Sequence, residues 1–161
     1  MKKKYLITIT IVLGVILLDQ LSKLYIDRVI PLHYSIPIAK NFIHITYIRN
    51  SGAAFGIFAS QVTGFKVFFF FITSIIAILI ILFFLRSLKD TQTLLTSSLS
   101  LIMGGAIGNL IDRVRLGEVI DFIDLHWYSY HWPAFNVADS AITIGGVFLI
   151  INTVFKKEKI Q

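Results

Sequence analysis

The stretch GGAIGNLIDR at 104–113, followed by VIDFIDLHWYSYHWPAF at 119–135 and NVAD at 136–139, decides how this chain folds. It lies between two apolar segments that are each long enough to cross a bilayer. It also carries five of the nine acidic residues in the chain: Asp112, Glu118, Asp121, Asp124 and Asp139. Carboxylates at the edge of a bilayer are costly, so this concentration of acids indicates a function.

The composition of the whole chain is that of an integral membrane protein. Its 161 residues are 56% hydrophobic and only 15% charged, and the mean hydropathy is +0.79, whereas soluble domains carry about 25% charged residues. We therefore expect one membrane-embedded domain over 1–161. The chain has no cysteine, which excludes disulfides and a thiol nucleophile. The net charge of +6 does not indicate a nucleic-acid partner, because the lysines gather at the ends of apolar segments.

Four apolar segments of about 20 residues are expected to be membrane-spanning helices. They cover roughly 5–26, 64–85, 94–113 and 136–155. The first has the basic start and apolar middle of a secretory signal peptide, but no small-x-small cleavage site follows, so we interpret it as an uncleaved span. The third contains Gly104 and Gly108 in a G-x-x-x-G pattern that permits close helix packing. The predicted fold is thus mainly α and membrane-integral.

The two longer segments between the spans are predicted to lie outside the bilayer. Residues 31–60 alternate apolar and polar positions in NFIHITYIRN (41–50) and continue into the glycine-rich NSGAAFGIF (50–58), which favours a small β-sheet on the membrane surface. Residues 114–135 are amphipathic and aromatic, which is typical of a loop at the membrane interface. His126 and His131 lie in this loop, but the spacing offers no convincing third ligand, so we predict no metal site.

The basic residues orient the predicted spans. Eight lie in two short tails and one short loop, against seven in two long loops and their flanks. Because short cytoplasmic segments are enriched in Lys and Arg, this higher density places both termini in the cytoplasm. The polar residues of interest then all lie at the outer face: Asp19, Lys23, Asn50, Asn109, Asp112, Asp121, Asn136 and Asp139.

Two of these features have both a structural and a functional interpretation. Asp19 and Lys23 share one face of the first span, and they form either an ion pair at the interface or a brace for a site. Asn50 precedes Gly52 in an Asn-Ser-Gly sequence, which is ordinary turn chemistry as well as a source of polar groups for the outer face.

Two Asn-x-x-Asp sets suggest acid–base chemistry. Asn109 with Asp112, and Asn136 with Asp139, each place an amide one helical turn from a carboxylate. Two carboxylates held together can share a proton, so that one activates water while the other protonates a leaving amine, without a cofactor. Spacing alone pairs Asp112 with Asp139. Helix capping is the alternative explanation for Asn136 and Asp139.

Five short motifs follow one another along the chain. They are D-Q-x-x-K at 19–23, N-x-G-x-A-F-G at 50–56, G-G-A-x-G-N-x-x-D-R at 104–113, V-I-D-F at 119–122 and F-N-x-A-D-S at 135–140. In this order the sequence resembles lipoprotein signal peptidase (signal peptidase II), a family of bacterial aspartyl membrane proteases. The resemblance covers nearly the whole chain, and no motif position departs from the family pattern.

The resemblance implies four spans, an outer β-cradle at about 31–60 and a mobile outer helix or loop near the active site at about 114–135. It implies cleavage of bacterial prolipoproteins just before a cysteine that carries diacylglyceryl, at the outer face of the cytoplasmic membrane. The catalytic acids carried over are Asp121 and Asp139, which replaces the pair expected from spacing. Residues expected to support the site or bind substrate are Asp19, Lys23, Asn50, Gly52, Asn109, Asp112, Arg113 and Asn136. The expected partners are this lipid-modified substrate and membrane lipid, with no obligatory protein partner.

Two other functions remain as alternatives. A small transporter or channel subunit would use intramembrane acids as proton sites, and it predicts acids near mid-span and broken helices. The acids in this sequence gather at one membrane face instead. A metal hydrolase would use the same aspartates as ligands, and activity that survives a strong chelator would argue against it.

Overall fold

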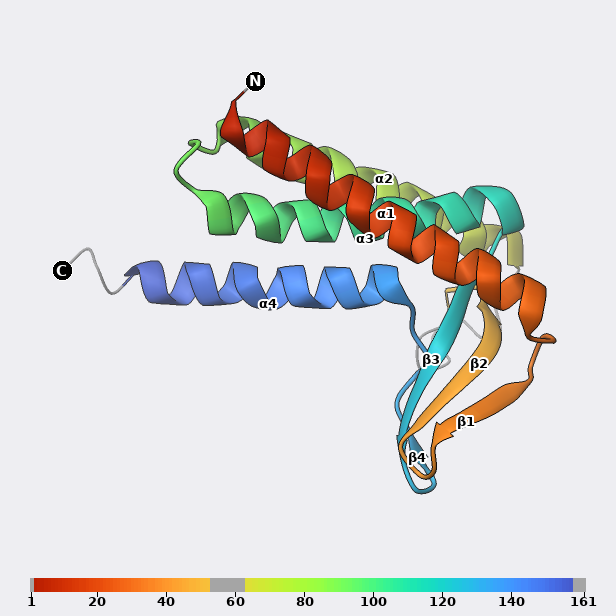
Figure 1. Cartoon of the computed structure of the whole chain (residues 1–161). Coiled ribbons are helices and arrows are strands. Elements are labelled where there is room, and N and C mark those ends of the chain that lie inside the picture. Colours follow the sequence, from red (N-terminus) through yellow and green to blue (C-terminus); the bar gives the residue numbers. More distant parts are fainter. Residues whose placement is uncertain (1, 53–62, 158–161) are drawn as a thin grey trace.

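A bundle of four long helices carries a small antiparallel sheet at one end (Figure 1). The computed structural model describes residues 2–52 and 63–157. The helices are α1 (Lys3–Val29), α2 (Thr63–Ser87), α3 (Thr93–Leu116) and α4 (Val137–Lys157). α1 begins and α4 ends at the end of the bundle away from the sheet (Figure 1).

All four helices are long and apolar enough to cross a membrane, with mean hydropathies of 1.9, 3.1, 1.6 and 1.7 in chain order. The helix ends match the four predicted spans to within three residues. The predicted fold class, an integral membrane protein with four spanning helices and a small sheet, is confirmed.

The central helix of the bundle is α3. Over its most apolar part, 56% of α3 is buried, compared with 17% for α1, 11% for α2 and 17% for α4. Glycine allows the close approach of α4, because a Cβ on Gly105 would lie only 2.3 Å from the carbonyl oxygen of Ala138. On the other side of α3, an apolar cluster joins it to α1 and α2 through Val12, Ile81, Leu85, Leu99 and Met103.

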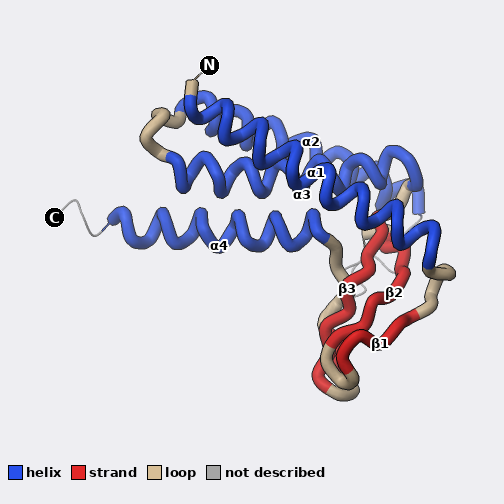
Figure 2. The backbone as a smooth tube through the Cα atoms, viewed as in Figure 1, coloured by secondary structure: helices blue, strands red, loops and turns tan. Residues whose placement is uncertain are grey.

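The sheet has the strand order β1-β2-β3-β4, and all its neighbouring strands are antiparallel. Figure 2 shows the strands gathered beyond one end of the helices. β1 (Ser35–Ala39) and β2 (Ile43–Asn50) lie within the segment predicted to form a β-cradle. Residues 53–60 of that predicted segment are outside the described residues.

The segment 114–135, predicted to be an outer loop or mobile helix, contains a long strand instead. β3 (Val119–Trp127) pairs with β2 along its length and, at its far end, with the short β4 (Tyr130–His131). The run VIDFI is rich in β-branched and aromatic residues, which favour strands. The aromatic residues at 127–132 are instead typical of an interfacial loop, which is why the strand is not expected from the sequence. Asp121 is consequently held by a paired strand and not by a loop.

An apolar cluster anchors the sheet to the end of α1. It consists of Ile26, Ile30, Tyr47, Ile120 and Phe122. The hydroxyl of Tyr47 also donates a hydrogen bond to the carboxylate of Asp27, and Arg49 Nε donates to that hydroxyl at 2.9 Å. These contacts fix the near end of β3 beside the helices.

Candidate active site

A buried ion network joins α1 to α3 at the end of the bundle nearest the sheet. Lys23 Nζ lies 2.8 Å from Asp19 Oδ2 and 2.9 Å from Asp112 Oδ2. It also donates a hydrogen bond to Asn109 Oδ1 at 2.9 Å. Gln20 Nε2 reaches an oxygen of each carboxylate at 3.1 Å. Asp19, Lys23 and Asp112 are at most 1% exposed, so the structure favours the brace interpretation over an ion pair at the membrane interface.

Gly108 makes room for this network. A Cβ at position 108 would lie 2.7 Å from Asp19 Oδ2, too close for any other residue without a shift. The second oxygen of Asp19 accepts the backbone N–H of Ala138 at 2.9 Å, in the first turn of α4. Asp19 therefore connects α1 to both α3 and α4.

Asp139 lies in the first turn of α4, where it takes part in a helix cap. Its backbone N–H donates to Asn136 Oδ1 at 2.9 Å, and the backbone N–H of Asn136 donates to Asp139 Oδ2 at 3.3 Å. The capping interpretation is thus correct for the local structure. Asn109 Nδ2 also donates to Asp139 Oδ1 at 2.8 Å, so the carboxylate is oriented from α3 as well.

Asp121 is 3% exposed on β3, and each of its carboxylate oxygens receives a hydrogen bond from an asparagine. Asn136 Nδ2 donates to Oδ1 at 2.7 Å, and Asn50 Nδ2 donates to Oδ2 at 2.9 Å. Burial raises the pKa of Asp121 to about 7, and the nearby charge of Asp139 acts in the same direction. The hydrogen bonds from Asn50 and Asn136 lower the pKa but do not offset burial.

Asp121 and Asp139 line one cleft of about 570 Å³ between the sheet and the start of α4. The side chain of Asn136 contacts both residues, since it donates to the carboxylate of Asp121 and accepts the N–H of Asp139. Asp112 is not among the described residues that line this cleft. Its Oδ2 contacts Lys23 and accepts the N–H of Ile120 at 3.2 Å. The geometry therefore brings together the pair carried over from the family, and not the pair expected from spacing.

Asn50 combines its two predicted roles. Its side-chain oxygen accepts the N–H of Gly52 at 2.8 Å, which closes the turn, while its amide points to Asp121. Gly52 has a φ of +98°, and a Cβ there would lie 2.2 Å from the ring of Phe70, so this position requires glycine. Residues 53–56 of the same motif are outside the described residues.

Arg113 connects this region to α2. Its Nη1 donates to Ser74 Oγ at 3.3 Å, and its guanidinium lies 5.6 Å from the centre of the Phe70 ring. Arg113 thus holds its positive charge between α3 and α2, and in the described part of the chain it forms no ion pair with Asp121 or Asp139.

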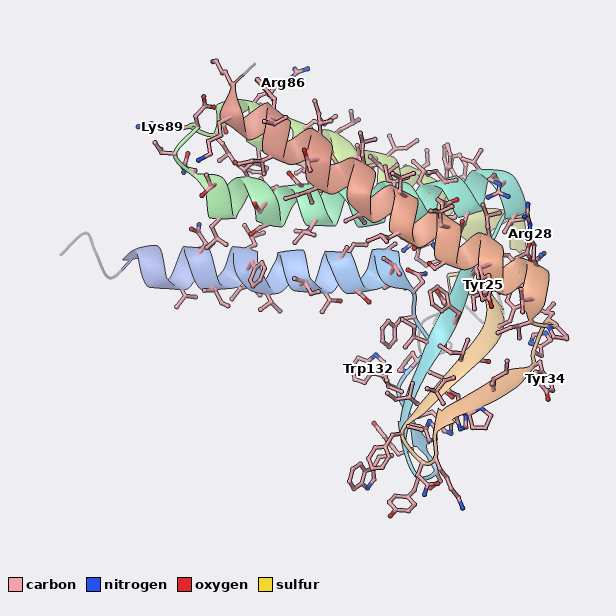
Figure 3. The ribbon with its side chains drawn as sticks, in the orientation of Figure 1. Tyr25, Arg28, Tyr34, Arg86, Lys89 and Trp132 are labelled. Carbon is pink, nitrogen blue, oxygen red and sulfur yellow. The ribbon has the colours of Figure 1, made fainter. Side chains whose placement is uncertain are left out.

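Sequence reasoning missed three residues of this region. Gln20 belongs to the buried ion network, and its place inside the D-Q-x-x-K motif is the one signal that could have identified it. Trp132 and Phe135 line the cleft and also an adjoining apolar cleft of about 490 Å³ that runs along α4 to Ile144. Trp132 projects from the sheet on the side of α4 (Figure 3). Nothing in the sequence distinguished Trp132 from the other interfacial aromatic residues.

Comparison with known proteins identifies the family of this chain. A model of the family described as Signal peptidase (SPase) II matches residues 11–155. The lipoprotein signal peptidase of Syntrophotalea carbinolica is 52% identical over 137 residues, which are 85% of this chain and 84% of the relative. That of Geobacter sulfurreducens is 47% identical over 159 residues, which are 99% of this chain and 98% of the relative.

Solved structures give the same result. One described as a bacterial membrane enzyme superposes with a TM-score of 0.85 at 35% identity, covering 96% of this chain and 91% of that chain. A second with the same description gives a TM-score of 0.81 at 36% identity, covering 91% of both chains. By sequence and by fold, this chain belongs to the signal peptidase II family.

Proposed function

We propose that this member of the signal peptidase II family removes signal peptides from prolipoproteins with Asp121 and Asp139 as its catalytic dyad. The observation that carries the proposal is the shared cleft, in which both carboxylates are oriented by asparagine side chains. Asn136 contacts both aspartates, so one side chain fixes their relative positions.

The two aspartates take different roles because their surroundings differ. Burial raises the pKa of Asp121 to about 7, so Asp121 is the proton donor of the proposed pair, while the less buried Asp139 is the base. Asp139 takes a proton from water, and the water oxygen bonds to the carbonyl carbon of the scissile peptide. Asp121 gives its proton to the leaving nitrogen as the C–N bond breaks. Proton transfer from Asp139 to Asp121 then restores the starting state.

The substrate that fits this site is a prolipoprotein whose cysteine carries diacylglyceryl. The apolar cleft along α4 contains Asp139 together with Leu125, Phe135 and Ile144, so an acyl chain bound there would lie next to the dyad. Each buried CH₂ contributes about 0.8 kcal/mol, so the lipid supplies much of the binding free energy. It also brings the scissile bond to the bilayer surface, where the cleft lies.

The proposed orientation places both termini in the cytoplasm and the cleft at the outer face of the cytoplasmic membrane. Arg86 and Lys89 lie at the end of the bundle where α1 begins and α4 ends, and the sheet lies at the other end (Figure 3). The buried amine of Lys4 also lies at the first end, where it donates to backbone carbonyls of 85, 86 and 88 at 2.6–3.1 Å. A dense basic end is typical of the cytoplasmic side.

The test is cleavage of a purified lipid-modified prolipoprotein by wild type and by Asp121→Asn, Asp139→Asn and Asp112→Asn. We expect the first two variants to lose processing while they still insert in the membrane and accumulate. Asp112→Asn is expected to retain part of the activity, because it acts through Lys23. Asp90→Asn, the same change at an exposed acid between α2 and α3, is the matched control. Full cleavage by both dyad variants would refute the proposal.

The same assay separates the alternatives. We expect a strong chelator to leave cleavage unchanged, whereas a metal hydrolase that uses these aspartates would lose activity. A transporter would need broken helices and acids near mid-span. In the described residues, α1, α3 and α4 are continuous, and the buried acids gather near the sheet end.

A further inference from the structure

We propose that the far end of the sheet holds a second site, which binds one Zn²⁺ ion through His44, Asp124 and His126. Three of the four histidines in the chain gather here: His44, His126 and His131. They come from three different strands and surround a single carboxylate. The proposal does not depend on the peptidase mechanism.

Strand pairing brings these residues together. His44 on β2 is the partner of Asp124 on β3, and His126 on β3 is the partner of His131 on β4. Asp124 and His126 are two residues apart on one strand, so their side chains leave the same face. The sequence spacing of His126 and His131 does not reveal this cluster. Its third member, His44, lies 80 positions before Asp124 (124 − 44).

The donor atoms are spaced for a shared metal ion. One ligand atom from each of His44, Asp124 and His126 lies within 4.8 Å of the others. His44 Nδ1 is 3.8 Å from Asp124 Oδ2. Zinc binds nitrogen at about 2.0–2.1 Å and carboxylate oxygen at about 2.0–2.2 Å, so two ligand atoms of a tetrahedral site lie about 3.4 Å apart. His44 and Asp124 would therefore close by about 0.4 Å around an ion, and the ring of His126 would close with them.

A buried nitrogen points independently to a ligand. His126 is 9% exposed, and its Nδ1 is buried without a hydrogen-bond partner among residues 2–52 and 63–157. Its ring packs between those of His44 and His131, with centroid distances of 4.2 Å and 4.6 Å. Buried polar atoms are nearly always paired in native proteins. A metal ion would give this nitrogen its partner.

His131 holds the carboxylate in place. Its Nδ1 lies 2.9 Å from Asp124 Oδ1 and 3.0 Å from Oδ2. Hydrogen bonds of this kind commonly orient metal-binding side chains. His131 is therefore a positioning residue, and water takes the fourth position on zinc. Imidazole donors with one carboxylate favour zinc over Mg²⁺ or Ca²⁺, which prefer oxygen ligands.

The site is separate from the peptidase cleft. Asp121 and Asp124, the nearest proposed ligand, are three residues apart along β3, which corresponds to about 10 Å, and side chains at this spacing leave opposite faces of the strand. The ion would join β2 to β3 near the end of the sheet, beside the exposed aromatic residues Phe42, Trp127 and Tyr130. Zinc is thus expected to stabilise the sheet and to leave the chemistry of peptide cleavage unchanged.

The test uses the full chain without a polyhistidine tag, stripped with a chelator and titrated with Zn²⁺ in detergent by calorimetry. We expect one ion per chain, with the affinity reduced at least tenfold in His44→Gln and in Asp124→Asn. His33→Asn is the matched control, because His33 is the remaining histidine and its φ of 66° is one that asparagine tolerates. Zinc should raise the thermal unfolding midpoint of wild type and control, and not that of the two variants.

Two results would overturn the proposal. One is the absence of saturable one-ion binding by the wild-type chain, and the other is equal zinc affinity in all four proteins. His44 and Asp124 are partly exposed, so metal-free variants should fold and still cleave prolipoprotein, which checks their integrity. X-ray absorption at the zinc edge of the wild-type protein gives an independent result: two imidazole ligands support the site, and oxygen ligands alone contradict it.

Discussion

The buried polar groups at the two ends of β3 differ in their hydrogen bonding. The near end is the part beside the helices, around Asp121, and the far end is the part around His126. Near the helices, both oxygens of Asp121 are hydrogen-bonded by asparagines, and Asn136 continues the network to α3 and α4. At the far end, His126 Nδ1 is buried and has no hydrogen-bond partner in the described part of the chain. In a site that acts through its own side chains, the buried polar atoms are hydrogen-bonded to one another. A buried donor or acceptor without such a partner indicates that a ligand binds there.

The near end should therefore be sensitive to the loss of any one partner. Lys23→Met would leave the carboxylates of Asp19 and Asp112 buried and without their cation. Breaking such a buried pair typically costs about 3–5 kcal/mol. We expect the thermal unfolding midpoint in detergent to fall accordingly, with cleavage lost at growth temperature. Lys40→Met, the same change at an exposed lysine, is the control. Equal midpoints for the two variants would show that the network is not under this electrostatic constraint.

The pKa of Asp121 makes the near end sensitive to pH. The folded protein binds this proton more tightly than the unfolded chain, because the pKa is about 7 when folded and near 3.8 otherwise. The stability from this group is therefore complete below about pH 4 and is lost as the pH rises through about 7, by up to about 4 kcal/mol. Asp121→Asn should lack this pH-dependent loss, whereas its amide nitrogen faces one of the two asparagine donors and lowers stability by the same amount at every pH. Thermal unfolding from pH 5 to pH 8 provides the measurement, and parallel curves for the two proteins would contradict it.

The rate of cleavage should depend on the protonation of Asp121 in the same way. If Asp121 donates its proton to the leaving nitrogen, kcat falls about tenfold per pH unit above about pH 7, as a property of the coupled pair. Asn50→Ala removes a hydrogen bond that lowers the pKa of Asp121, so the decline should begin at a higher pH. Its kcat at neutral pH should fall about tenfold, through the lost orientation of the carboxylate. A decline that moves to lower pH would reverse the assigned role of Asn50.

The sequence predicts the near end better than the far end, for physical reasons. Apolar length alone locates the four helices, and alternation at 41–50 predicts β2. Local spacing does not reveal the proposed dyad, since strand pairing and a helix cap bring Asp121 and Asp139 to one cleft. Only the resemblance to the signal peptidase II family points to these two aspartates as the catalytic pair. His44 and Asp124 meet through the register of β2 against β3, which shifts between Ile45 and Ile48, and no local pattern reveals such a register.

The smallest expected change in stability is at the far end of β3, where a substitution should stabilise the fold and not destabilise it. It is therefore the sharpest test of the difference between the two ends. His126→Phe replaces an unpaired buried nitrogen by an apolar ring of similar shape. In metal-free protein this change should be neutral or stabilise the fold by about 1 kcal/mol, because Nδ1 has no hydrogen-bond partner to lose among the described residues. Asn136→Leu near the helices should instead destabilise the fold, since it removes the three hydrogen bonds that the side-chain amide of Asn136 donates. Thermal unfolding of both variants in chelator compares the two ends directly. Destabilisation by His126→Phe beyond about 1 kcal/mol would mean that the far end is as fully paired as the near one, which would remove the reason to expect a ligand there.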